Sequence, residues 1–148
     1  MRILLQRVSR AEVRTDGSTI GAIERGVLAL VGVGHDDDEG TVDALARRVA
    51  ELRIFADAEG RANRSLRDVG GAALVVSQFT LYADTRRGRR PGFTDAAEPE
   101  LAERLVGRFV AALQTQGVAV ATGRFGAAME VELVNDGPFT IWIDSAAR

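Results

Sequence analysis

Hydrophobic and polar positions along the chain predict a series of strands in its first third. Residues 2–15, RILLQRVSRAEVRT, combine β-branched side chains with partial alternation, and the hairpin turn signal Asp16-Gly17 follows them. Residues 18–24, STIGAIE, are expected to return as a second strand. The continuous apolar run VLALVGVG, residues 27–34, predicts a strand that is buried on both faces.

Two later segments have the spacing of amphipathic helices. The first covers residues 41–53, and its apolar face consists of Val42, Leu45, Ala46, Val49 and Leu52. The second begins near Pro99, because proline is tolerated in the first turn of a helix, and ends at Gly117. Its apolar stripe consists of Leu101, Leu105, Phe109 and Leu113.

The remaining apolar segments complete the predicted fold. Residues 72–83, AALVVSQFTLYA, are expected to form a buried strand that runs out into a loop. Three short strands are expected to close the chain, and two of them, VELV and FTIWI, flank the breakers Asn135, Asp136, Gly137 and Pro138. We therefore predict one domain, residues 1–148, of the α+β class, with a largely antiparallel sheet, a barrel-like core and two main helices.

The composition narrows the class of protein. With 46% hydrophobic and 27% charged residues, the chain has the make-up of a soluble globular domain. It has no apolar run long enough to span a bilayer and no signal-peptide pattern after Met1, so we expect a cytoplasmic protein without a membrane partner. The absence of cysteine excludes thiolate nucleophiles and thiolate metal sites.

The charges are distributed unevenly. The net charge is −2, yet all 19 cationic residues are arginines, and four of them fall within RRGRR as Arg86, Arg87, Arg89 and Arg90. An arginine fork can pair with phosphate in a bidentate way that lysine cannot match. This segment is either a solvated surface loop, which the sequence alone favours, or a contact with phosphate groups.

Most familiar catalytic patterns are missing. His35 is the only histidine and lies in a polar loop before the first helix, and no G-x-S-x-G elbow exists. Gly32 and Gly34 begin like a dinucleotide loop, but the third glycine position is Asp37. The acidic run 36–39 lacks the ligand spacing of a calcium loop. We therefore expect neither a metal ion nor a cofactor.

The segment SQFT is the remaining candidate for chemistry. Ser77, Gln78 and Thr80 place three hydrogen-bonding side chains at the end of an apolar strand. If the strand stops there, the backbone N–H groups of Phe79 and Thr80 lose their ladder partners and can point at a ligand oxygen, as an oxyanion hole requires. The alternative is a strand with one polar face, which the segment alone favours.

Over its whole length the chain resembles the D-aminoacyl-tRNA deacylase family. The most specific features are two signature motifs, SQFTL at residues 77–81 and NDGPFT at residues 135–140. The surrounding segments that also look like the family are QRVSRAEV (6–13), VLALVGVGHDDDE (27–39), RIFADAEGRANRSL (53–66) and TGRFGAAMEV (122–131). RRGRR is not a signature motif, so its role is inferred separately.

The resemblance implies a homodimer that hydrolyses the ester between a D-amino acid and the terminal adenosine of tRNA, and also acts on glycine mischarged on tRNA(Ala). In the family, the peptide bond that matches Gly137-Pro138 is cis, and this motif projects into the active site of the other subunit. A rigid wall there would reject every L-residue by steric clash while glycine and D-residues pass. The expected partners are tRNA and a second copy of the chain, and DNA is not among them.

The resemblance also implies roles in catalysis. The oxyanion contacts fall to the backbone N–H groups of Phe79 and Thr80, with Gln78 orienting the substrate and the ribose 2′-hydroxyl assisting the attack. A competing interpretation makes Thr80 a covalent nucleophile, although no base partner is identifiable in the sequence.

Four further residues are assigned to substrate binding. Ser77 and Asn135 belong to the two motifs, while Phe125 and Met129 either line the adenine pocket or belong to the core. Two rival functions stay open at this point. One is an esterase for small molecules that uses the same oxyanion site, and the other is a noncatalytic RNA-binding module.

Overall fold

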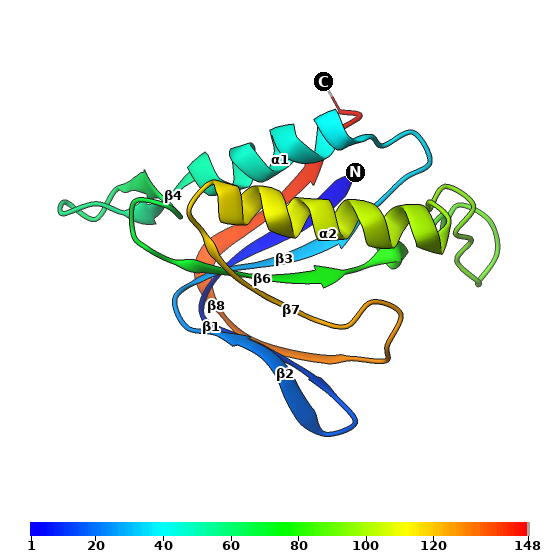
Figure 1. The fold of residues 1–148 in the computed structure, drawn as a ribbon, viewed down its shortest axis with the longest axis horizontal. Helices are drawn as coiled ribbons and strands as arrows, with labels where there is room; N and C mark the ends of the chain where they lie inside the picture. Colours follow the sequence, from blue (N-terminus) through cyan, green and yellow to red (C-terminus); the bar gives the residue numbers. More distant parts are fainter. Residues whose placement is uncertain (148) are drawn as a thin grey trace.

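Two helices cover one face of a twisted sheet (Figure 1). This arrangement comes from a computed structural model, which describes residues 1–147. The helices are α1 (Glu39–Glu51) and α2 (Pro99–Thr115), and a single 3₁₀ turn, η1, covers Phe79–Tyr82. The strands are β1 (Arg2–Thr15), β2 (Ser18–Ile23), β3 (Gly26–Gly32), β4 (Arg53–Ala56), β5 (Ala62–Ser65), β6 (Ala72–Ser77), β7 (Ala119–Thr122) and β8 (Glu130–Asp144).

The main sheet is mixed, with antiparallel pairing around its first strand. The strand order is β2-β1-β3-β6-β7, and β8 pairs with β1 as well. β1 runs antiparallel to β2, β3 and β8, whereas β3–β6 and β6–β7 are parallel. Each parallel pair is joined through a helix, as parallel connections require, while β4 and β5 form a separate antiparallel pair. The predicted α+β class is confirmed.

The sheet curls until its two end strands meet. At Gly21 in β2, a Cβ atom would lie 2.5 Å from the carbonyl oxygen of Thr122 in β7, so only glycine permits this close approach. The concave side encloses its own hydrophobic cluster, which includes Val8, Val13 and Leu74. The barrel-like core is thus confirmed as a nearly closed sheet.

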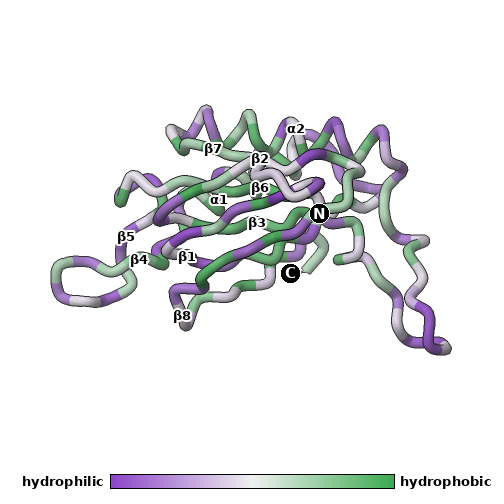
Figure 2. Tube along the Cα trace, turned by 90° about the horizontal axis from the view of Figure 1, so that it is seen from below, coloured by the Kyte–Doolittle hydropathy of each residue, from purple (hydrophilic) through white to green (hydrophobic). Residues whose placement is uncertain are grey.

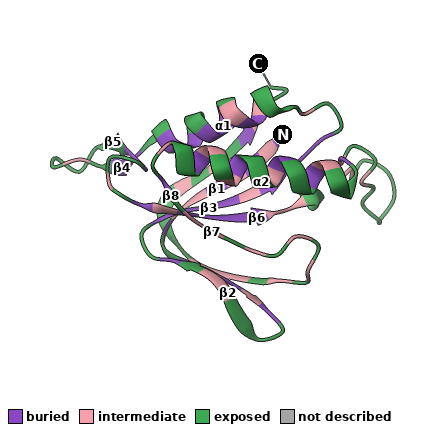
Figure 3. Ribbon diagram, viewed as in Figure 1, coloured by how far each residue is buried: buried purple, intermediate pink, exposed green. Residues whose placement is uncertain are grey.

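The larger core lies between the sheet and the helices. Figure 3 shows both helices buried on the side that faces the sheet and exposed on the other side. The predicted apolar faces are confirmed: Val42, Leu45, Ala46 and Val49 of α1 and Leu105, Phe109 and Leu113 of α2 are buried there, with Leu52 and Leu101 packed at its margin. No helix within residues 1–147 is long and apolar enough to cross a membrane.

Local signals set the ends of these elements. Asp16 and Gly17 have φ angles of 50° and 77°, which is the left-handed geometry of the predicted hairpin turn. The carboxylate of Asp38 caps α1 by accepting a hydrogen bond of 2.8 Å from the backbone N–H of Thr41. Gly117 follows α2 with a φ of 84°, as a glycine after a helix commonly does.

The prediction of three short closing strands is wrong. Only β7 and the long β8 follow α2, because VELV and FTIWI both pair with β1 in one continuous antiparallel strand. Asn135 lies opposite Val8 and Thr140 lies opposite Gln6, so residues 136–139 face Arg7 alone. The breakers therefore form a β-bulge of four residues against one instead of a turn, because both flanking segments stay paired with β1.

Candidate active site

A cavity of about 600 Å³ lies where β6 ends, beside the start of α2 and the connection between β7 and β8. Its walls are mostly apolar, and Glu98 is the only charged residue among them. The predicted site residues that line it are Ser77, Gln78, Phe79, Phe125 and Met129. An apolar cavity with a few polar groups at one end is typical of a binding site for a small organic group.

The chain changes direction at the polar end of this cavity. The backbone N–H of Gln78 donates to the carbonyl oxygen of Val31 at 2.8 Å, which is the last ladder bond before η1 begins. Arg2 then holds the turn, because its guanidinium donates to the carbonyl oxygen of Leu81 at 3.0 Å and lies 4.4 Å from the centre of the Tyr82 ring. The bond to Val31 thus holds the end of β6, and the contacts of Arg2 hold the turn that follows it.

Tyr82 anchors the end of η1 in the protein interior. Burial raises the pKa of its phenol, and the nearby negative charge of Asp37 raises this pKa further. The phenol therefore stays protonated and lies 3.5 Å from a carboxylate oxygen of Asp37 as a hydrogen-bond donor. A buried anchor of this kind keeps the exposed part of the turn in place.

The backbone N–H groups of Phe79 and Thr80 are free in this geometry. Neither has a hydrogen-bond acceptor within residues 1–147, since the first N–H groups of a helical turn lack partners inside it. In the sequence this loss of ladder partners was one of two alternatives, and the end of β6 at Ser77 meets the condition on which it depended. Two free donors next to a cavity can stabilise a negative oxygen of a bound ester.

Among the described residues, the hydroxyl of Thr80 has no hydrogen bond to a side chain that could act as a base. Its oxygen accepts a hydrogen bond from the side-chain amide of Gln78, and an amide does not take up a proton. The ring of His35, the only histidine, lies 2.5 Å from the carbonyl oxygen of Thr94 and does not line the cavity. These contacts favour the backbone of Thr80 over its side chain as the functional group.

Aromatic and apolar side chains form the far walls. Phe79 is 55% exposed although it is a large apolar residue, and its ring meets Phe93 edge-on with centroids 5.0 Å apart. Phe125 and Met129 line the cavity while also packing at the margins of the two cores. Sequence reasoning missed Phe93 and Glu98, because neither belongs to a motif and only the fold brings them here.

The second motif lies in the bulge of β8, and Arg7 holds it. The Gly137-Pro138 peptide bond is cis, and both residues are exposed. Two nitrogens of Arg7 donate to the carbonyl oxygens of Asp136 and Gly137, each at 2.9 Å, and a third donates to the carbonyl oxygen of Ile54. Arg7 also lies 3.1 Å from the carboxylate of Asp136, but no sequence signal marked it, because its partners in the bulge are about 130 positions away along the chain.

The structure separates the two motifs within one chain. Gly137, Pro138 and Asn135 are absent from the residues that line the cavity with Gln78 and Phe79. Asn135 instead spans the base of the bulge, where its amide donates to the carbonyl oxygens of Arg7 and Phe139 at 2.9 and 3.2 Å. Its assignment to substrate binding stays a prediction.

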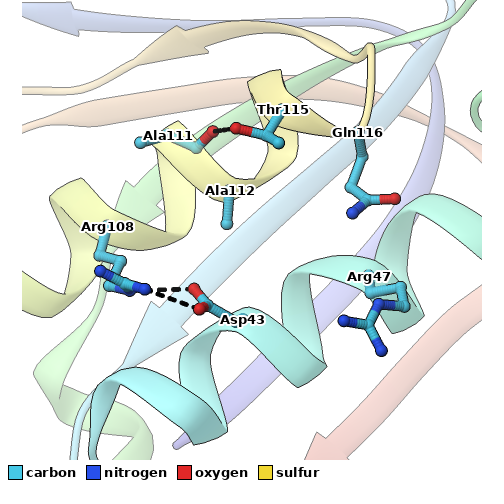
Figure 4. A pocket seen from close by; sticks show the side chains of 7 residues that line it. All are labelled: Asp43, Arg47, Arg108, Ala111, Ala112, Thr115 and Gln116. Atoms are coloured by element: carbon cyan, nitrogen blue, oxygen red, sulfur yellow. Dashed lines mark hydrogen bonds and ion pairs between the residues drawn. The ribbon is translucent and has the colours of Figure 1, made fainter.

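A second cavity, of about 390 Å³, lies between the outer faces of the two helices (Figure 4). Its walls are largely polar, and Arg108 donates to both carboxylate oxygens of Asp43 across it, at 2.9 and 2.7 Å. These bonds hold the pKa of Asp43 below its ordinary value. None of the motif residues reaches this cavity, so we interpret the Asp43–Arg108 pair as a link between the helices.

Comparisons with known proteins place the chain among deacylases. The family model described as D-Tyr-tRNA(Tyr) deacylase matches residues 4–144. A protein of Roseiflexus castenholzii named D-aminoacyl-tRNA deacylase is 64% identical over 99% of this chain and 93% of its own length. A protein of the same name from Paracoccus denitrificans is 59% identical over 100% of this chain and 99% of its own length.

Solved structures show the same fold. The structure titled c-Myc DNA Unwinding Element Binding Protein superimposes with a TM-score of 0.92 at 36% identity, over 99% of this chain and 100% of that chain. A probable eukaryotic D-amino acid tRNA deacylase superimposes with a TM-score of 0.81 at 18% identity, over 96% and 97% of the two chains.

Fold and relatives together define an enzyme of the hydrolase class. More specifically, the chain belongs to the D-Tyr-tRNA(Tyr) deacylase family, so the resemblance drawn from the SQFTL and NDGPFT motifs is confirmed.

Proposed function

We propose that the protein hydrolyses the ester bond of D-aminoacyl-tRNA, and of glycine mischarged on tRNA(Ala), and so releases free tRNA and the amino acid. The observation that carries this proposal is the apolar cavity lined at its polar end by Ser77, Gln78 and Phe79, next to which the backbone N–H groups of Phe79 and Thr80 are free. Membership of the deacylase family supports the choice of substrate. The substrate belongs to translation, so the enzyme acts in the cytoplasm.

The reaction needs positioning more than a strong nucleophile, because an aminoacyl ester is already activated. A water molecule attacks the carbonyl carbon, and the resulting oxyanion is stabilised by the N–H groups of Phe79 and Thr80. The bond between this carbon and the ribose 3′-oxygen then breaks, and the 3′-oxygen receives the proton that water loses. The ribose 2′-hydroxyl assists this transfer, and no residue forms a covalent intermediate.

The walls of the cavity match the two ends of such a substrate. Phe125 and Met129 offer an apolar surface on which adenine can lie, since base recognition by protein commonly uses stacking on side chains. Gln78 and Ser77 lie at the polar end, where the ester and the ribose hydroxyls require hydrogen bonds. The terminal adenosine therefore lies against the apolar wall, and the ester lies at the polar end.

The proposal assigns chiral selection to the bulge of a second protomer. Gly137 is exposed, and a Cβ atom added to it would meet nothing within 4 Å of its own chain. A rigid bulge that borders open space is suited to contact a neighbour. In the homodimer we propose, Gly137 and Pro138 close the partner's cavity on the side where an L side chain would point, and the clash rejects it.

The decisive measurement is deacylation of matched D- and L-aminoacyl-tRNA pairs by the purified protein. We expect rapid release from the D-ester and from glycyl-tRNA, and little release from the L-ester. Equal rates on free D-amino-acid esters and on tRNA esters would favour the small-molecule esterase. Binding of tRNA without any turnover would favour the noncatalytic RNA-binding module.

A further inference from the structure

The segment between η1 and α2 forms an arm whose arginines, within residues 1–147, mostly lack ion-pair partners. Asp84 and Gly92 form an antiparallel bridge with backbone hydrogen bonds of 2.7 and 2.9 Å, which closes residues 84–92 into a loop that we call the arginine arm. The arginines between these two residues are exposed. Figure 2 shows this segment extending from the body of the molecule with a hydrophilic tip.

Arg86 is set apart from the other arginines of the arm. Its guanidinium donates to both carboxylate oxygens of Asp84, each at 2.8 Å, and its backbone N–H donates to one of them at 3.0 Å. These hydrogen bonds hold the pKa of Asp84 well below its ordinary range. Arg86 and Asp84 therefore neutralise each other and shape the base of the arm.

The other arginines of the arm have no such partner. Within residues 1–147, Arg87, Arg89 and Arg90 form neither a hydrogen bond nor an ion pair, whereas arginines on β1, such as Arg10 and Arg14, are paired with glutamates. The tip of the arm thus holds unneutralised positive charge on a chain whose net charge is −2. Such a local concentration attracts a polyanion even when the whole protein is weakly acidic.

The arm is built into the walls of the active-site cavity. It leaves from η1, which carries Phe79, and returns at Phe93, whose ring contacts Phe79. No cationic side chain among residues 1–147 lines the cavity itself. A nucleotide whose base and ester fill this cavity must leave its phosphate outside, and the four steps of the chain from Asp84 to Gly88 span at most about 14 Å.

We propose that Arg87, Arg89 and Arg90 bind the backbone phosphates that immediately precede the terminal adenosine of the tRNA. The identity of this nucleic acid rests on the proposed function. Arginine suits the role because its planar fork can contact two phosphate oxygens at once. Arg86 has a different role: it holds the base of the arm through Asp84 and contacts no phosphate.

The first test removes two free charges from the arm and compares the result with a matched control. Arg89→Gln/Arg90→Gln should raise KM for D-aminoacyl-tRNA about tenfold or more, and should lower the slope of log KM against log salt by about 0.7 per lost phosphate contact. The value of kcat should not change. Arg47→Gln/Arg48→Gln removes the same charge from the exposed face of α1 and should alter neither quantity.

Two further measurements separate this proposal from the function on which it rests. A D-aminoacyl ester of adenosine alone lacks the preceding phosphates, so the arm variant should hydrolyse it as fast as the unmodified protein does. Arg86→Gln should lower the salt slope by less than the arm variant does, because it weakens the base of the arm but removes no phosphate contact. If the unmodified protein deacylates tRNA but the arm variant keeps its KM and salt slope, the phosphate role is wrong. If the unmodified protein deacylates neither substrate, the proposed function itself fails.

Discussion

The two signature motifs lie in contrasting surroundings. SQFT turns out of a buried strand, lines a cavity of its own chain and is anchored from the interior by Tyr82. The bulge around Gly137 and Pro138 is exposed, lines no part of that cavity and is held from one side by Arg7. The SQFT motif therefore contributes to a cavity within its own protomer, whereas the bulge offers a rigid surface that contributes nothing to that cavity. The predictions below test this difference.

The largest effect is expected from removing the support of the bulge. Arg7→Ala deletes the hydrogen bonds to the carbonyl oxygens of Asp136 and Gly137, so the wall should lose its position. A misplacement of about 1 Å can cost 10²-fold in rate, and we expect kcat/KM for D-aminoacyl-tRNA to fall by about that factor. Arg7→Lys, which keeps the charge but not the fork, should recover only part of the activity. Full activity of Arg7→Ala would remove the bulge from the mechanism.

A smaller but more specific effect is expected from filling the space at Gly137. Gly137→Ala meets nothing in its own chain, so stability should change by less than about 0.5 kcal/mol. The added methyl group should nevertheless impair D- and glycyl-tRNA hydrolysis about tenfold, because it overfills the partner's cavity.

Mixed dimers make this prediction decisive. Ala96→Phe should block the cavity, because Ala96 lines it. Gly137→Ala and Ala96→Phe protomers, reassembled in equal amounts, should regain about a quarter of full activity, since half of the dimers then hold one intact site. Recovery requires that wall and cavity come from different chains, and a mixture as inactive as its parts would exclude the cross-subunit arrangement.

A modest effect is expected at the aromatic wall of the cavity. Phe93→Ala removes the edge-on contact with Phe79, a contact worth about 0.5–1.5 kcal/mol beyond the buried area. KM for the D-ester should rise up to about tenfold, since 1.4 kcal/mol corresponds to that factor. Phe93→Leu keeps most of the apolar surface, so its KM should lie between those of the unmodified protein and of Phe93→Ala. Steady-state kinetics on both variants measures the contribution of this pair.

The smallest effect is expected at the side chain of Thr80. Thr80→Ala removes only the partner of the Gln78 amide and leaves the backbone donor in place, so activity should fall by no more than about fivefold, as for one neutral hydrogen bond. Rapid-quench experiments should detect no acyl-enzyme. A trapped ester on Thr80, or loss of nearly all turnover with binding intact, would restore it as a nucleophile.

Periodicity predicted the elements whose burial is simple. Local sequence patterns correctly predicted the apolar faces of α1 and α2, the doubly buried β3 and the Asp16-Gly17 turn, because one local signal determines each of them. The closing strands were mispredicted because the residues of the NDGP segment are typical both of a turn and of a β-bulge. Only the pairing of both flanks with β1 decides between them, and that pairing is not local.

The sequence predicted the motifs of the candidate site but not the residues that hold those motifs in place. SQFT marked the polar end of the cavity because a strand that stops leaves donors free. Arg7 and Phe93 escaped notice, since each acts through residues distant along the chain: Arg7 through the bulge of β8, and Phe93 through a neighbour 14 positions away in the printed sequence. The split between Arg86 and the rest of RRGRR likewise depended on the position of Asp84.

The bulge has a consequence for how the protein avoids aggregation. β8 is 15 residues long, and within residues 1–147 it pairs on one side only, with β1. A long open strand edge with Trp142 and Val134 exposed invites other chains to add strands without limit. Because residues 136–139 break the regular edge into two short pieces and Pro138 lacks an N–H group, no extended strand can align along its whole length. The same irregularity thus limits unspecific growth of the sheet along this edge.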